Sequence, residues 1–186
     1  MTSSGYKMNE LKIGIILSTI RKGRRSQEIG NWLLKESSKY SRSHYEIIDL
    51  RDYDLPLYGK EDKLGVSKKF IEKTAEFDGF IFVLAEYNHS IPGVLKNAFD
   101  YLGKTMHNKA AAIVSYGAIG GARAAEHLRG ILGQMDVACI STQIALSIFY
   151  DYDDNQNFKP LDLHDDNLKI IFKRVAEWAK ALKPLR

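Results

Sequence analysis

The chain has 186 residues, of which 45% are hydrophobic and 27% charged, a composition typical of one globular domain spanning residues 1–186. Its single cysteine, Cys139, excludes an internal disulfide, and 27 basic against 23 acidic residues give too small an excess to indicate nucleic-acid binding. Residues 1–10 are polar and are predicted to be a flexible N-terminus, and no run is long enough for a membrane span, so we expect a cytoplasmic protein.

The first half of the chain alternates apolar runs with amphipathic patterns. Leu11–Leu17 is predicted to be a strand, and Ser26–Tyr40 a helix, because its apolar residues recur every three or four positions. Tyr45–Leu50 is typical of a second strand, and Gly65–Phe77 again has helical spacing. Phe80–Ala85 is an unbroken apolar run, which indicates a strand buried on both faces of a parallel sheet.

The second half continues the alternation. The predicted elements are a helix over Val94–Leu102, a strand over Lys109–Ser115, a helix over Ala122–Gly133, a strand over Val137–Leu146 and a long helix over Leu161–Leu182. The segment Phe149–Lys159 fits neither period and is predicted to be an excursion on the surface or at a subunit contact.

Five strand-and-helix units in strict alternation predict an α/β fold of the flavodoxin-like type. The expected sheet is doubly wound, parallel and five-stranded, with the order 2-1-3-4-5. In that order the ligand crevice lies between the carboxyl ends of strands one and three. The loops that follow the strands are therefore the places to look for a site.

The loop after the first predicted strand is rich in hydroxyl and basic side chains. Lys22, Arg24 and Arg25 form a local basic cluster, which we interpret as an anion site. Together with the free N–H groups at the start of the next helix, the loop provides a phosphate cradle. The candidate phosphate-binding residues are Ser18, Thr19, Arg21, Arg25 and Ser26. The alternative is that Ser26 only caps the helix and the arginines are solvated.

The same loop lacks the Gly-Lys-Ser/Thr of a Walker loop and the glycines of GxGxxG, which argues against nucleoside triphosphates and dinucleotides bound in those ways. Two later loops suit a flat ring. The first offers backbone groups and an aromatic edge at Glu86, Tyr87, Asn88 and His89, and the second allows close backbone approach at Ser115, Tyr116, Gly117, Gly120 and Gly121. Taken singly, each loop is also explained by packing or by a strand-to-helix turn.

Taken together, the three loops resemble the NADPH-dependent FMN reductases, the group that includes quinone, chromate and azo-dye reductases. The resemblance covers Leu11 to Leu146, and its most specific part is Glu86-Tyr87-Asn88-His89-Ser90-Ile91-Pro92-Gly93 through Ala98. Two positions depart from the family pattern. Ser18-Thr19 stands where Gly-Ser is usual, and Ala85 stands where Pro is usual before Glu86.

The resemblance implies bound FMN. It implies that Thr19, Arg21 and Ser26 hold the phosphate, that residues 86–89 border the flavin, and that residues 115–117 lie under its far edge. It further implies NADPH or NADH as co-substrate, hydride transfer through N5 of the flavin to a quinone, free flavin or similar acceptor in a ping-pong cycle, and a homodimer or homotetramer. No side chain is expected to act as catalytic acid or base.

Two other hypotheses about the function stay open. One is a non-catalytic flavin-binding electron carrier or a redox-sensing protein that docks on partners, and the other is a doubly wound domain without a cofactor. A metal site is not expected, because the histidines do not form HExxH and the acidic residues Asp151, Asp153 and Asp154 lack the Gly and Glu of a calcium loop.

Overall fold

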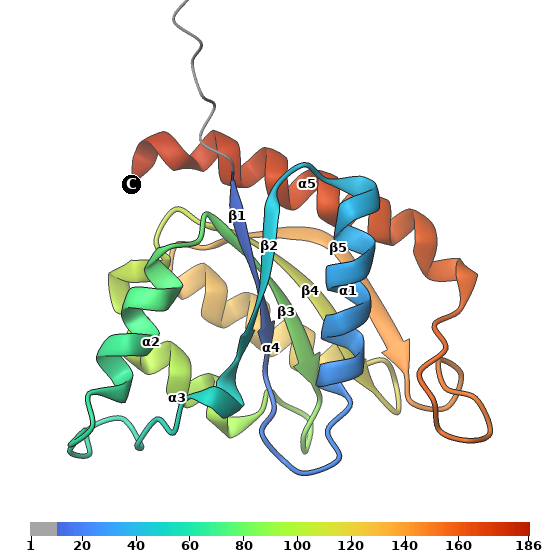
Figure 1. The fold of residues 1–186 in the computed structure, drawn as a ribbon, viewed down its shortest axis with the longest axis horizontal. Coiled ribbons are helices and arrows are strands. Elements are labelled where there is room, and N and C mark those ends of the chain that lie inside the picture. The colour runs from blue at the N-terminus through green and yellow to red at the C-terminus, as the bar shows by residue number, and fades with distance from the viewer. Residues whose placement is uncertain (1–10) are drawn as a thin grey trace, which may run out of the picture.

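The computed structural model describes residues 11–186, so the N-terminal segment 1–10 lies outside it. Five parallel strands form one sheet in the order β2-β1-β3-β4-β5, which confirms the predicted topology (Figure 1). The strands are β1 (Lys12–Leu17), β2 (His44–Asp49), β3 (Gly79–Ala85), β4 (Ala110–Gly117) and β5 (Ala138–Ser147). The helices are α1 (Ser26–Tyr40), α2 (Val66–Ala75), α3 (Gly93–Leu102), α4 (Ala122–Gln134) and α5 (Asp165–Leu182).

The sheet is covered on both faces. On one face α1 and α5 pack against alternate residues of the central strands, among them Ile15 and Val83. On the other face α2, α3 and α4 pack against the intervening residues, such as Ile16 and Phe82. Every residue of β3 is buried, as expected for a central strand with helices on both sides.

The last helix begins later than its sequence pattern predicts. Leu161 is extended, with ψ 146°, and a short 3-10 turn at Asp162–His164 precedes α5. The regular helix then starts with Asp165 and Asp166 in its first turn, where their negative charge is favoured by the helix dipole.

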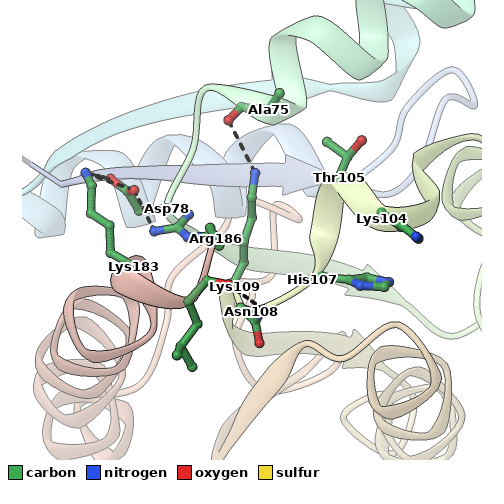
Figure 2. A pocket seen from close by; sticks show the side chains of 10 residues that line it. Ala75, Asp78, Lys104, Thr105, His107, Asn108, Lys109, Lys183 and Arg186 are labelled. Atoms are coloured by element: carbon green, nitrogen blue, oxygen red, sulfur yellow. Dashed lines mark hydrogen bonds and ion pairs between the residues drawn. The ribbon is translucent and has the colours of Figure 1, made fainter.

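At the amino ends of the strands lies a cavity of about 620 Å³ with several basic side chains in its wall (Figure 2). Lys183 and Arg186 pair with Asp78 at 3.1 and 2.9 Å. Lys109 Nζ donates to the carbonyl oxygens of Thr74 and Ala75 at the end of α2, and burial lowers the pKa of Lys109 to about 8. These contacts fasten the helix ends to this edge of the sheet.

Candidate functional site

The loops that follow β1, β3 and β4 meet at the carboxyl edge of the sheet, where the arrowheads of these strands lie in Figure 1. Backbone hydrogen bonds join them: Ser18 N donates to Val83 O at 3.2 Å, and Glu86 N donates to Tyr116 O at 3.2 Å. Arg21 Nε also donates to the Tyr87 hydroxyl at 3.0 Å. The three loops singled out from the sequence therefore share one rim.

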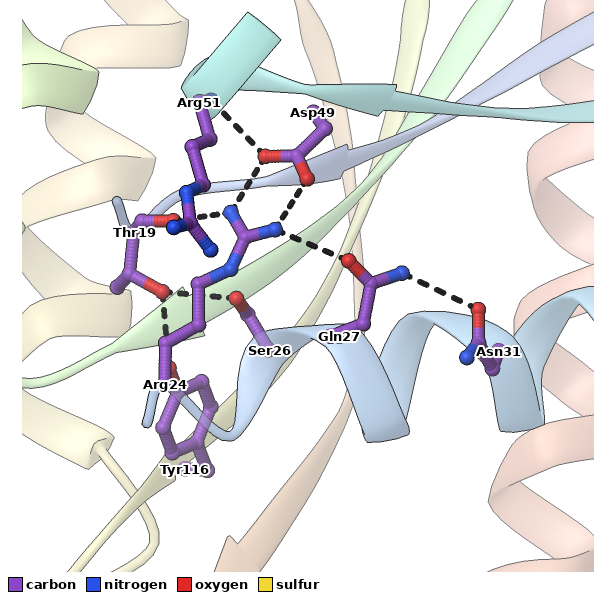
Figure 3. Close-up of polar contacts among 8 residues, drawn as sticks. All are labelled: Thr19, Arg24, Ser26, Gln27, Asn31, Asp49, Arg51 and Tyr116. Carbon is purple, nitrogen blue, oxygen red and sulfur yellow. Dashed lines mark hydrogen bonds and ion pairs between the residues drawn. The ribbon is translucent and has the colours of Figure 1, made fainter. Parts of the chain in front are cut away.

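The hydroxyl groups of the first loop gather at the start of α1. Thr19 Oγ1 and Ser26 Oγ lie 2.7 Å apart, and the Tyr116 hydroxyl lies 3.4 Å from Thr19 Oγ1 (Figure 3). Arg25 occupies the N-cap position of α1, and its side chain makes no capping hydrogen bond. Because an arginine side chain cannot accept a hydrogen bond, Arg25 leaves the first N–H groups of α1 available to an anion at the positive end of the helix dipole. This donor set fits a phosphate dianion.

The basic residues of the same loop do not act as one cluster, contrary to the interpretation from sequence. Arg24 is buried and forms a bidentate ion pair with Asp49, and it also donates to Thr19 O at 2.6 Å (Figure 3). Hydrogen bonding to Asp49 raises the pKa of Arg24. Arg24 therefore shapes the loop from inside, Lys22 and Arg21 are exposed, and Arg25 turns toward the later segment 149–159.

The second loop is a tight hairpin. Tyr87 and Ser90 exchange backbone hydrogen bonds of 3.0 and 3.1 Å across Asn88 and His89. These two residues have φ values of 47° and 72°, as in the type I′ turns of two-residue hairpins. Tyr87, Asn88 and His89 are exposed at the rim, so their side chains are accessible to a ligand.

Glu86, which we expected at the ring edge, has its carboxylate engaged by α4. It accepts from the backbone N–H of Arg123 at 3.1 Å and of Ala124 at 3.4 Å, and it pairs with the Arg123 guanidinium. Burial raises the pKa of Glu86, but these donors outweigh that effect and hold it below its usual value. The carboxylate thus ties the second loop to the first turn of α4. A contact of Glu86 with a flavin ring is therefore expected from its backbone groups and not from its side chain.

In the third loop the buried residues are used by the turn itself. Ser115 Oγ donates to Gly120 O and accepts from Gln143 Nε2 at 2.8 Å. Gly121 has φ +71°, and a Cβ there would lie 2.9 Å from Tyr116 N, so only glycine fits. Gly120 has φ +69°, and a Cβ there would lie 2.8 Å from Ala145 Cβ. Gly117 is half-buried at the rim and is the part of this turn that a ligand can approach.

The sequence patterns missed two residues next to the site. Arg123, the partner of Glu86, lies 37 positions away along the chain, and Gln156, which accepts from Arg25 Nη2 at 2.7 Å, lies 131 positions from Arg25. No local period or motif marks either residue, and the only sequence signal was that residues 149–159 fit no regular element. Cys139 is partly buried, and burial raises the pKa of its thiol.

Within residues 11–186 no helix combines the length and apolarity needed to cross a membrane. In that same part of the chain, no three or more His, Cys, Asp or Glu side chains gather as a metal ion would require.

Residues 11–151 match the model of the family described as NADPH-dependent FMN reductase. An NAD(P)H-dependent FMN reductase of Schizosaccharomyces pombe is 31% identical over 146 residues, which cover 74% of this chain and 73% of the relative. A 2-hydroxy-1,4-benzoquinone reductase of a Burkholderia species is 33% identical over 141 residues, covering 70% and 75%. A quinone reductase of Escherichia coli K12 is 32% identical over 135 residues, covering 68% and 72%.

Among solved structures, a flavoenzyme NAD(P)H:(acceptor) oxidoreductase from Paracoccus denitrificans superposes with a TM-score of 0.75 over 92% of this chain and 98% of its own. An oxidoreductase from Corynebacterium diphtheriae superposes with a TM-score of 0.71 over the same shares. Their sequence identities are 20% and 11%, so these two likenesses show the common fold alone.

Proposed function

Because the chain belongs to the NADPH-dependent FMN reductase family, we propose that it binds FMN and passes hydride from NADPH or NADH to a small acceptor. The acceptor class that the relatives' names favour is a quinone, with a free flavin as the other member of the same proposal. Nicotinamide and acceptor would use the site in turn, in a ping-pong cycle.

The observation that carries the proposal is the meeting of three loops at one rim, with a phosphate-binding donor set at one end. Thr19 and Ser26 provide hydroxyls, the first turn of α1 provides N–H groups, and Arg21 provides an exposed cation from the same loop. This set would hold the phosphate of FMN. Ser18 supports this set indirectly. Its Oγ accepts a hydrogen bond from Ala85 N at 3.3 Å, which fixes the turn after β1.

The other two loops would border the flavin ring. Tyr87, Asn88 and His89 offer exposed polar and aromatic groups on a rigid hairpin, while Gly117 lets the backbone approach closely. The remaining residues of the third loop, Ser115, Tyr116, Gly120 and Gly121, set the shape of the wall. In this proposal most of them act through position rather than by direct contact.

When bound, FMN supplies the chemistry, because its ring accepts hydride from the nicotinamide and delivers it to the acceptor. The residues of this chain would bind the cofactor, orient its ring and enclose it. We assign no side chain as catalytic acid or base: the Glu86 carboxylate, the acidic group nearest the rim by sequence, is already paired with Arg123. A homodimer or homotetramer stays a prediction, and exposed apolar side chains such as Leu57, Tyr58 and Leu64 are compatible with a subunit contact.

The deciding experiment follows the flavin spectrum of the purified, FMN-loaded protein. We expect visible flavin absorbance that is lost on anaerobic addition of NADPH and restored by a quinone, with NADH in a parallel run to compare the two nicotinamides. A spectrum unchanged by either nicotinamide would contradict the reductase and favour an electron carrier. A protein that stays colourless with excess FMN would contradict flavin binding altogether.

A further inference from the structure

The hairpin of residues 86–90, which would border the flavin ring in the proposed function, has a second attachment to α4 besides Glu86. Its last residue, Ser90, places its hydroxyl 2.9 Å from Nδ1 of His127. A hydroxyl can donate to a neutral imidazole and accept from a protonated one, so the hydrogen bond forms in either state of the ring. The hairpin is therefore attached to α4 at its end as well as at its start.

Both partners on α4 lie on one face of that helix. Arg123 pairs with Glu86, and His127 lies four residues further along, which places the two side chains one helical turn apart. The first and last residues of the hairpin are thus held by one rigid element. We call the two attachments, Glu86 to Arg123 and Ser90 to His127, the hairpin clamp.

The turn between the two attachments has a backbone conformation that costs free energy for residues with a Cβ. Asn88 and His89 have φ values of 47° and 72°, in the left-handed region. Residues other than glycine stay in that region only where the surrounding structure holds them. The His89 and His127 rings lie 6.0 Å apart, centre to centre, so His127 is next to the tip of the hairpin as well as to its end. The clamp supports this conformation.

Packing contributes little beside the second attachment. A cavity of about 600 Å³ opens there between the hairpin and α4, and both Ser90 and His127 line it. Side chains that line an open space lose the dispersion contacts that a filled interior provides. The hydrogen bond between Ser90 and His127 therefore has a larger part in fixing this end of the hairpin than it would have in a packed core.

We propose that His127 is a positioning residue for the flavin ring, because it holds the hairpin through Ser90 in the conformation that borders the ring. A loop that already has its bound conformation loses less conformational entropy when the ligand arrives. His127 thus raises the affinity for the ring and leaves the phosphate contacts unchanged. The inference rests on the proposed function, since it concerns the ring that the hairpin would border.

The test measures binding of FMN and of riboflavin, which has the same ring but no phosphate. His127→Phe keeps an aromatic ring next to His89 and removes the nitrogen that meets Ser90. His127→Asn keeps a hydrogen-bonding atom as many bonds from Cβ as Nδ1. We expect His127→Phe to raise both dissociation constants by the same factor, about threefold to tenfold, as for the loss of one hydrogen bond. His127→Asn should recover most of the affinity.

Two further variants check that the effect comes from this contact. Ser90→Ala removes the other half of the hydrogen bond, so the double variant with His127→Phe should bind no more weakly than either single variant. Ser90→Ala also tests the contact if His127→Phe does not fold. His44→Phe is the matched control, because His44 is exposed at the amino end of β2, away from the rim, and both dissociation constants should stay as in wild type.

The outcomes separate the inference from the proposed function. If His127→Phe or Ser90→Ala binds riboflavin as tightly as wild type, or if His127→Asn binds it as weakly as His127→Phe, the inference is overturned. The proposed function then still stands, since wild type binds FMN and responds to the nicotinamide. If wild type itself does not bind FMN, both fail.

Discussion

At the scale of single residues, three nearby arginines of the first loop have three different environments. Arg24 is buried against Asp49, Arg25 lies on the Tyr152 ring, and Arg21 is exposed with one hydrogen bond to the Tyr87 hydroxyl. A buried ion pair gives up its hydration and depends on its partner, so Arg24 serves the fold. Arg21 is exposed, and among the described residues only its Nε makes a hydrogen bond, so it is the arginine best placed to meet an incoming anion.

We predict that Arg21→Ala weakens FMN binding by about 1.5–3 kcal/mol, because a charge-assisted contact to the phosphate is lost. The FMN dissociation constant, measured by quenching of flavin fluorescence, should rise by at least tenfold. Lys22→Ala is the control, since Lys22 is an exposed neighbour of the same charge. Equal FMN affinity in wild type and Arg21→Ala would remove Arg21 from the phosphate site.

At the scale of elements, the candidate site depends on how the loops are tied to helices. The hairpin after β3 is fastened to α4 by the Glu86 carboxylate, which accepts from the first-turn amides of Arg123 and Ala124. A carboxylate in that place satisfies orphan N–H groups and is favoured by the helix dipole. The third loop has its own fastening through Ser115, Gly120 and Gln143. These contacts within the protein hold the second and third loops in place at the rim.

The Glu86 contact predicts a pH dependence of stability. The folded-state pKa of Glu86 lies below its unfolded value of 4.5, so the unfolded chain binds more protons and stability rises with pH in that window. We expect wild type to be more stable than Glu86→Gln above pH 4.5, and the difference to shrink as the pH falls through the lowered pKa. Denaturant unfolding of both proteins across that range measures the difference.

Glu126→Gln is the control for that measurement, because Glu126 lies on the same helix with a side chain that is 74% exposed. Because an exposed ion pair contributes little to stability, Glu126→Gln should unfold at nearly the same denaturant concentration as wild type. If the difference in unfolding free energy between wild type and Glu86→Gln grows as the pH falls, the assigned contact is contradicted.

At the scale of the whole molecule, the site is assembled from parts of the chain that are far apart in sequence. Parallel strands all deliver their following loops to one edge, and the order 2-1-3-4-5 places β1 between β2 and β3 with β4 next to β3. Helices packed on both faces keep the strand ends fixed relative to one another. A ligand that touches three loops therefore stabilises the native state as a unit.

We predict that saturating FMN raises the free energy of unfolding by about 2.7 kcal/mol when free FMN is one hundred times its dissociation constant. Urea unfolding with and without FMN measures the increase. Riboflavin at the same concentration should give a smaller increase, since it lacks the phosphate. An unfolding midpoint that FMN does not move would argue against binding at this rim.

Much of this molecule follows from local pattern. The elements from β1 to β5 were predicted within a few residues, and α1 was predicted at its observed limits, Ser26 and Tyr40. Hydrophobic periodicity is a property of residues close together in sequence, so it can be recognised without knowledge of the fold. The strict alternation of strand and helix then restricts the topology, because parallel strands need crossovers of one hand. The placement of three loops on one rim follows from that topology.

What the sequence by itself determined is the fold, the position of the rim and the family of Leu11 to Leu146. Only the tertiary structure decided which donor meets which acceptor: Arg24 turns inward to Asp49, Arg123 pairs with Glu86, and Arg25 donates to Gln156. Such pairings join residues that are far apart along the chain and depend on angles between side chains that no local period encodes. A charged side chain takes its role from the partner that folding brings to it.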